Sequence, residues 1–208
     1  LCEPLGVDVA IVSRGMAADP RIGAGYLSPG CGFGGPSFSG ELLDFSRTLK
    51  TALDLDQLGF VEQALRINER QHEVLFRELT GRRIAIWGAA YKPDSAIVKD
   101  SAVHPLLQAL WAQGATTVVY DPLAGASLRE VYPEQVLLTL AGSALEATTG
   151  AEALVLITAC DEFQSPDFHA LRAALARPLV LDGRNIYEPE AMAALGFQYV
   201  GIGRGEVV

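Results

Sequence analysis

From Arg82 onward the sequence alternates short apolar runs with helical patterns, and this alternation constrains the fold more than any other feature. The runs are almost continuously apolar, which is typical of strands covered on both faces, as in a parallel sheet. They occupy 84–87, 118–120, 154–157, 179–181 and 199–202, and helices are predicted over 103–113, near 145, over 168–175 and over 190–195. The order predicts βαβ units in a doubly wound α/β domain, with ligands at the carboxyl ends of the strands.

The preceding part of the chain has a helical pattern from residue 38 to 79, with apolar residues recurring about every 3.6 positions. Gly59 marks a break between two long helices, and the second helix is expected to end at Gly81, a glycine in the C′ position. Such helices bury against a partner or pack only on their own domain, and both readings stay open. Residues 1–20 predict a helix end, a break at Gly6 and a short helix. We therefore divide the chain into residues 1–80 and 81–208.

Composition excludes several classes of function. Half of the 208 residues are hydrophobic, which allows a sizeable core, and the net charge of -9 disfavours nonspecific nucleic-acid binding and anionic membranes. No apolar run approaches the ~20 residues of a membrane span. The three widely spaced cysteines predict a reduced, cytoplasmic protein with no metal site. The start has no basic region or initiator methionine, so we expect it to lie within a connector rather than a signal peptide.

A glycine-rich stretch over residues 29–41 leads directly into the first long helix. Glycine allows positive φ and close approach of a ligand, and a helix N-terminus offers free N–H groups to an anion. A tight turn before a helix is the simpler reading of the glycines alone. Cys31 lies inside this stretch, where it is read as a small buried or incidental thiol or as a reactive one.

The sequence around the glycine-rich stretch resembles that of the UDP-glucose/GDP-mannose 6-dehydrogenase family. Residues 19–23 (DPRIG) and Gly32-Phe33-Gly34-Gly35 match the active-site segment of that family. Further matches follow in the family's order: 87–94 (GxxxKxD), 98–101, 120–122 (YDP), 181–185 (DxRN) and 197–204. The resemblance covers nearly the whole chain. It implies long central helices that form a homodimer, followed by a Rossmann-like domain that binds a UDP- or GDP-sugar.

The catalytic positions of the family are altered. As the resemblance implies it, these enzymes oxidise C6 of the sugar twice with NAD, through a cysteine thiolate assisted by a lysine and an aspartate. Ser37 stands at the cysteine position, Gly40 at the lysine and Glu41 at the aspartate. A serine hydroxyl is far more basic than a thiol and needs an adjacent base. We therefore expect Ser37 and Glu41 to leave the double oxidation incomplete.

The substrate-binding residues of the family are matched better than its catalytic residues. The family's substrate residues fall on Arg21, Tyr26, Phe33, Gly34, Lys92 and Arg184. In the family the arginine matched by Arg21 often reaches the sugar across the dimer. A lysine and an arginine at strand ends suit a diphosphate, although Lys92 alone is also read as a solvated loop charge. Lys99 replaces the arginine that contacts NAD in the family and loses its bidentate geometry.

The dinucleotide fingerprint itself is not found. No GxGxxG follows a strand, and residues 84–90 contain only one glycine, so the domain that would bind NAD is expected outside this sequence. Two hypotheses remain. The chain is a truncated member of this family that binds a nucleotide sugar, or it is a non-catalytic oligomerisation or ligand-binding module derived from it.

Overall fold

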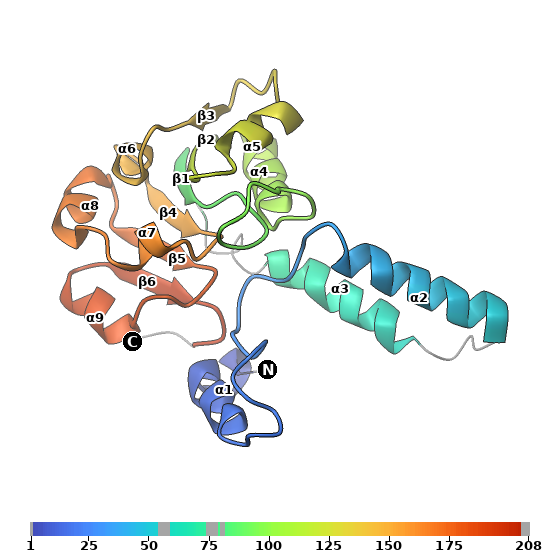
Figure 1. Cartoon of the computed structure of the whole chain (residues 1–208). Helices are drawn as coiled ribbons and strands as arrows, with labels where there is room; N and C mark the ends of the chain where they lie inside the picture. Colours follow the sequence, from blue (N-terminus) through green and yellow to red (C-terminus); the bar gives the residue numbers. More distant parts are fainter. Residues whose placement is uncertain (1, 54–58, 74–78, 80–81, 205–208) are drawn as a thin grey trace.

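The computed structural model describes residues 2–53, 59–73, 79 and 82–204. Within them, six parallel strands form one sheet in the order β3-β2-β1-β4-β5-β6 (Figure 1). The strands are β1 (Arg83–Trp87), β2 (Thr116–Tyr120), β3 (Leu138–Leu140), β4 (Ala153–Leu156), β5 (Leu179–Asp182) and β6 (Gln198–Gly201). The strand order reverses between β1 and β4, and this is where doubly wound sheets open a crevice at their carboxyl ends.

Helices cover both faces of the sheet. Ile84 and Ile86 of β1 join a core under two helices, and Ala85 and Trp87 join a second core under the others. The first face carries α4 (Val103–Ala112) and α5 (Gly125–Val131); the second carries α6 (Ala144–Thr148), α7 (Asp161–Gln164), α8 (Phe168–Ala174) and α9 (Pro189–Ala194). The apolar runs are therefore buried on both sides, which confirms the predicted α/β class.

The five predicted strands all form, and their ends differ from the predictions by no more than two residues. The strand β3 and the helices α5 and α7 were not predicted. β3 has only three residues and gains its place by pairing with Thr117 to Val119 of β2. So short a segment carries no periodicity that separates a strand from a loop.

The N-terminal part begins with a 3-10 turn (Glu3–Leu5) that ends at Gly6, where φ is +63°. The helix α1 (Val9–Ala17) follows, and the Asp8 carboxylate caps it by accepting the Ala10 amide at 2.7 Å. Its first amide, from Val9, donates to the carbonyl of Gly203 at 2.9 Å, just beyond β6. The segment predicted to contain a break at Gly6 and a short helix is thus confirmed, and it is attached to the far end of the sheet.

Two long helices, α2 (Phe38–Leu53) and α3 (Phe60–Glu73), form a hairpin that projects away from the sheet (Figure 1). The predicted break at Gly59 falls in the turn before α3. Residues 74–78 and 80–81, which include the predicted end at Gly81, lie outside the described residues, and Leu79, to which the helix was predicted to extend, is in no helix.

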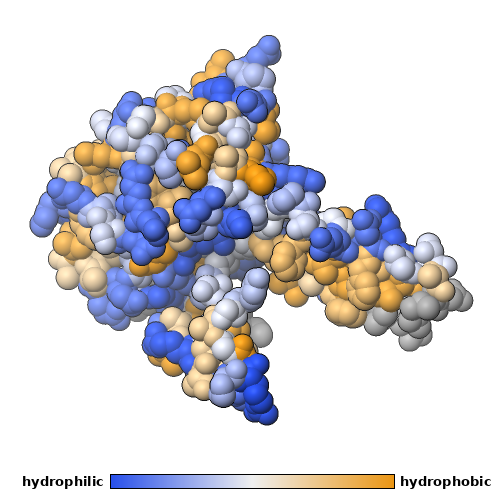
Figure 2. Space-filling model, in the orientation of Figure 1, coloured by the Kyte–Doolittle hydropathy of each residue, from blue (hydrophilic) through white to orange (hydrophobic). Residues whose placement is uncertain are grey.

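Apolar side chains remain uncovered along this hairpin (Figure 2). They are Phe38, Leu43, Phe45, Phe60 and Ile67, each between 43% and 63% exposed. Large apolar side chains gathered on one surface are typical of an interaction site. No helix in the described part of the chain is both long enough and apolar enough to cross a membrane.

Candidate functional site

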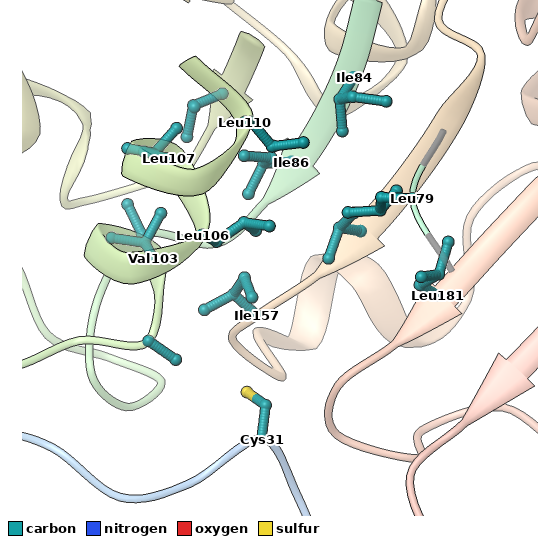
Figure 3. Close-up of a cluster of buried hydrophobic side chains, with 14 of the residues drawn as sticks. Cys31, Leu79, Ile84, Ile86, Val103, Leu106, Leu107, Leu110, Ile157 and Leu181 are labelled. Atoms are coloured by element: carbon teal, nitrogen blue, oxygen red, sulfur yellow. The ribbon is translucent and has the colours of Figure 1, made fainter. Parts of the chain in front are cut away.

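The glycine loop (residues 29–37), the part of the glycine-rich stretch that precedes α2, lies over the carboxyl ends of the central strands. The amide of Cys31 donates to the Gly183 carbonyl at 2.9 Å, and that of Gly35 donates to the Lys99 carbonyl at 3.1 Å. The Cys31 side chain is fully buried and points into the first core, near Ile157 (Figure 3). The reading of Cys31 as a buried thiol is therefore confirmed, and its burial raises its pKa.

Arg184 holds the loop from below. Its Nε donates to the carbonyl of Ile157 at 2.6 Å, and its Nη1 donates to the carbonyl of Gly32 at 3.2 Å. A Cβ on Gly30 would stand 3.0 Å from Nη1, so the loop backbone passes close over the guanidinium. A guanidinium carries five N–H donors, so these two bonds leave others for a ligand. Arg184 thus has a structural role that the sequence did not reveal.

A buried carboxylate fixes the turn that carries Arg184. Asp182, the last residue of β5, has no exposed surface. It accepts hydrogen bonds from the amides of Arg184, Ile186 and Tyr187 and from the hydroxyl of Tyr199, at 2.8 to 3.1 Å. Burial raises the pKa of Asp182 despite these donors. The DxRN motif is therefore a rigid turn that presents its arginine to the glycine loop.

Beside Arg184 lies a pocket of about 250 Å³, which we call the arginine pocket. Its walls come from α1, from the chain just before and within the glycine loop, and from the ends of β5 and β6. They are Ala10, Ser13, Arg14, Ala17, Ala24, Leu27, Ser28, Pro29, Arg184, Asn185 and Arg204. Three guanidinium groups and no carboxylate line it, so the pocket favours an anion.

The side chain of Arg204 is largely buried beside this pocket. It is only 5% exposed and its Nη1 lies 3.1 Å from Glu188 Oε2. Its buried Nε has no hydrogen-bond partner among the described residues. A buried donor without a partner is costly, and a ligand oxygen would satisfy it. The sequence matched Arg204 to the family only as part of a closing strand.

The other substrate residues expected from the sequence do not line this pocket. Arg21 pairs with Asp19 at 2.5 Å and its side chain is 87% exposed, and Tyr26 is fully exposed with φ at +62°. Lys92 lies over the ring of Tyr91, 5.6 Å from its centre, and is exposed, as is Lys99. The roles expected for these residues remain predictions.

The altered catalytic positions lie at the start of α2. Ser37 is exposed, and its carbonyl accepts the amide of Glu41 at 2.8 Å in the first helical turn. Phe33 and Gly34 are half-buried; a Cβ on Gly34 would stand 1.9 Å from the Asp100 carbonyl oxygen, so only glycine fits there. Gly40 faces open space. Among the described residues, no group of three acidic, cysteine or histidine side chains is arranged to hold a metal ion.

The crevice at the end of β1 does not suit a dinucleotide. In sheets of this strand order the amides after β1 bind the pyrophosphate. Here the amides of Ala89 and Ala90 donate to Asp121 Oδ2, and those of Leu123 and Ala124 donate to its Oδ1, at 2.7 to 3.1 Å. The protein's own carboxylate therefore engages these amides, so they are not free to bind a pyrophosphate.

The fold and the arginine pocket define a doubly wound α/β protein with an arginine-lined pocket near the carboxyl ends of its strands. Residues 1–70 match the central domain of the UDP-glucose/GDP-mannose dehydrogenase family, and residues 85–189 match its UDP binding domain. The chain belongs to this family, as the sequence motifs indicated.

Similar proteins and solved structures support this family assignment. The chain is 40% identical to the UDP-glucose 6-dehydrogenase of Pseudomonas aeruginosa and 35% identical to that of Rhizobium meliloti, over 98% of this chain and 47% of each relative. It resembles the structure of a UDP-glucose dehydrogenase from Pyrobaculum islandicum with a TM-score of 0.78 and 27% identity, over 97% of this chain and 45% of that one. The chain thus spans about half the length of the relatives it matches.

Proposed function

We propose that this chain binds a nucleotide sugar of the UDP type in the arginine pocket and does not itself oxidise it. The observation that carries the proposal is the grouping of Arg14, Arg184 and Arg204 around a pocket without carboxylates, beside the glycine loop. A diphosphate needs such forked cations, and the aliphatic wall formed by Ala17 and Leu27 suits the flat face of a base. The match of residues 85–189 to a UDP binding domain supports the same ligand.

Titration calorimetry tests this proposal. The chain is titrated in turn with UDP, UDP-glucose, GDP-mannose and NAD. We expect UDP and UDP-glucose to bind and NAD not to bind. Arg14→Gln should weaken UDP binding about tenfold, the loss of one charge-assisted contact of about 1.4 kcal/mol. Arg82→Gln, an exposed arginine just before β1 and outside the pocket, is the matched control. Equal affinities in the two variants would contradict the proposal.

Catalysis is proposed to be absent because the covalent step lacks its nucleophile. Ser37 is exposed at the family's cysteine position, and Gly40 leaves open space where the family has a lysine. In the family's reaction, NAD accepts the hydride. The amides that follow β1 in this chain already donate to Asp121, so they are not free to bind NAD. Formation of a uronate from UDP-glucose and NAD by this chain would overturn this part of the proposal.

A second copy of the chain is proposed to cover the apolar face of α2 and α3. The exposed Phe45, Phe60 and Ile67 support this, as does the family's central-domain match over the same residues. Arg21 and Tyr26, exposed and outside their own chain's pocket, are then available to the partner. Ile67→Glu should shift the dimer to monomer in sedimentation equilibrium, whereas the exposed Glu69→Gln on the same helix should leave it unchanged.

The division at residue 80, the cytoplasmic location and the alternative role also stay proposals. Residues 71–84 separate the two family matches, and the division at residue 80 falls within this gap, which supports it. Three unpaired cysteines suit a reducing compartment. The alternative, a module kept only for its interfaces, gains support if calorimetry finds no nucleotide binding while the dimer persists.

A further inference from the structure

The helix α3 contacts the glycine loop through a buried amide side chain. Asn68 is 9% exposed, the lowest exposure among the polar residues of α3 whose side chains the structure describes. Its Oδ1 accepts the Phe33 amide at 2.7 Å, and its Nδ2 donates to the Phe33 carbonyl at 2.9 Å. One side chain thus satisfies both backbone groups of a loop residue, as a neighbouring strand would.

Two neighbours extend this contact along the loop. Gln71, one turn further along α3, donates from Nε2 to the Gly30 carbonyl at 3.0 Å. His72 packs against Gly32, where φ is +109° and a Cβ would stand 2.6 Å from the His72 ring. Residues 30 to 33 are therefore held on one side by α3 and on the other by Arg184. Arg184 lines the arginine pocket, as does Pro29, the loop residue next to Gly30.

We propose that Asn68 is a positioning residue for the nucleotide site: by fixing the glycine loop it keeps Pro29 and Arg184 in place at the arginine pocket. The inference rests on the proposed function. An ordered loop binds without the entropy cost of fixing several glycine-rich residues, because glycine loses more conformational freedom than any other residue when it is fixed. Asn68 does not line the pocket, so it acts only through Phe33.

Asn68→Ala removes both bonds, and Asn68→Asp keeps the acceptor for the Phe33 amide but loses the donor to its carbonyl. Gln63→Ala is the matched control, because Gln63 is an exposed amide on the same helix. We expect Asn68→Ala to weaken UDP binding at least tenfold and to speed hydrogen exchange at the Phe33 amide. Asn68→Asp should keep that amide protected and bind with intermediate affinity. Gln63→Ala should change neither quantity.

The outcomes separate the two proposals. If the unchanged chain binds UDP and Asn68→Ala binds it as tightly as Gln63→Ala despite an exchanging Phe33 amide, the positioning role is overturned and the proposed function stands. If the unchanged chain binds no nucleotide while its Phe33 amide is protected, the proposed function fails and takes the positioning role with it. If Asn68→Ala does not fold, Asn68→Asp decides: unaltered affinity overturns the inference and a measured weakening supports it.

Discussion

The carboxylate of Asp121 accepts the amide of Ala89 at 2.7 Å across the gap between the ends of β2 and β1. Three more amides, from Ala90, Leu123 and Ala124, donate to the same carboxylate. Asp121 is the acidic residue that follows β2, where dinucleotide-binding folds use a carboxylate to hold a ribose. In this chain the Asp121 side chain points inward and accepts backbone amides of its own domain.

We predict that Asp121→Asn destabilises the chain by about 2 to 4 kcal/mol, because an amide side chain sets its own N–H donors against backbone donors. The measurement is urea unfolding followed by circular dichroism. Asp161→Asn, an exposed acid whose only side-chain bond is to Gln164 among the described residues, serves as control and should change stability by less than about 0.5 kcal/mol. Similar losses in both variants would show that the four amides do not depend on the charge.

Gly88, the first residue after β1, provides a steric test of the same crevice. Its φ is +90°, and an added Cβ would stand 2.5 Å from the Cβ of Thr158. Gly88→Ala should therefore cost about 3 kcal/mol in unfolding free energy. Gly40→Ala is the opposite case, because Gly40 lies in α2 with nothing within 4 Å, and it should gain up to about 1 kcal/mol. A tolerated Gly88→Ala would mean that β1 and β4 ends are less tightly apposed than described.

The pH dependence of stability should change when His72 is replaced. Burial lowers the pKa of His72, and the positive Arg184 lowers it further. Below its ordinary value of 6.5, the unfolded chain therefore binds more protons than the folded chain, so stability falls as the pH falls through that window. His72→Gln removes this contribution.

Unfolding midpoints in urea at pH 7.5 and pH 5 measure the effect. We expect the loss between the two pH values to be smaller in His72→Gln than in the unchanged chain. His169→Gln, an exposed histidine on α8, is the control and should keep the original loss. An identical pH dependence in all three proteins would show that His72 does not contribute to the loss of stability at low pH.

Thiol reactivity should separate the three cysteines. Cys31 is fully buried, and burial together with nearby carboxylates raises the pKa of Cys160 to about 12. Reaction requires an accessible thiolate, so both should react slowly with a disulfide reagent. Cys2 is only half-buried and should react first. One fast and two slow thiols are expected in the native chain, and three fast ones in denaturant; rapid native labelling of Cys31 would contradict its place in the core.

The fold could be read from the sequence where burial leaves a pattern. Strands such as β1 and β4 are covered on both faces and appear as continuous apolar runs, and α2 and α3 show the helical period. β3 has one buried residue, Leu138, and takes its form from the edge of β2. Pairing of this kind is a tertiary effect and leaves no local signal.

The site was predicted less completely. The glycine loop and Arg184 were singled out from motifs, and the structure brings them together. The loop is positioned by Asn68, an amide in a polar helix that looks no different in sequence from its exposed neighbours. Asp121 was matched to a motif, but its four amide donors come from the backbone, which carries no sequence signature.

The hydrogen bond between Val9 and Gly203 has a consequence for synthesis on the ribosome. The segment that carries α1, Arg14 and the glycine loop leaves the ribosome long before Gly183, Arg184 and Gly203, the residues on which it docks. Contacts between such distant residues form late, since they wait for the intervening chain. The arginine pocket includes Arg204, so it is completed only after β6 and Arg204 have been made, well after α1 and the glycine loop.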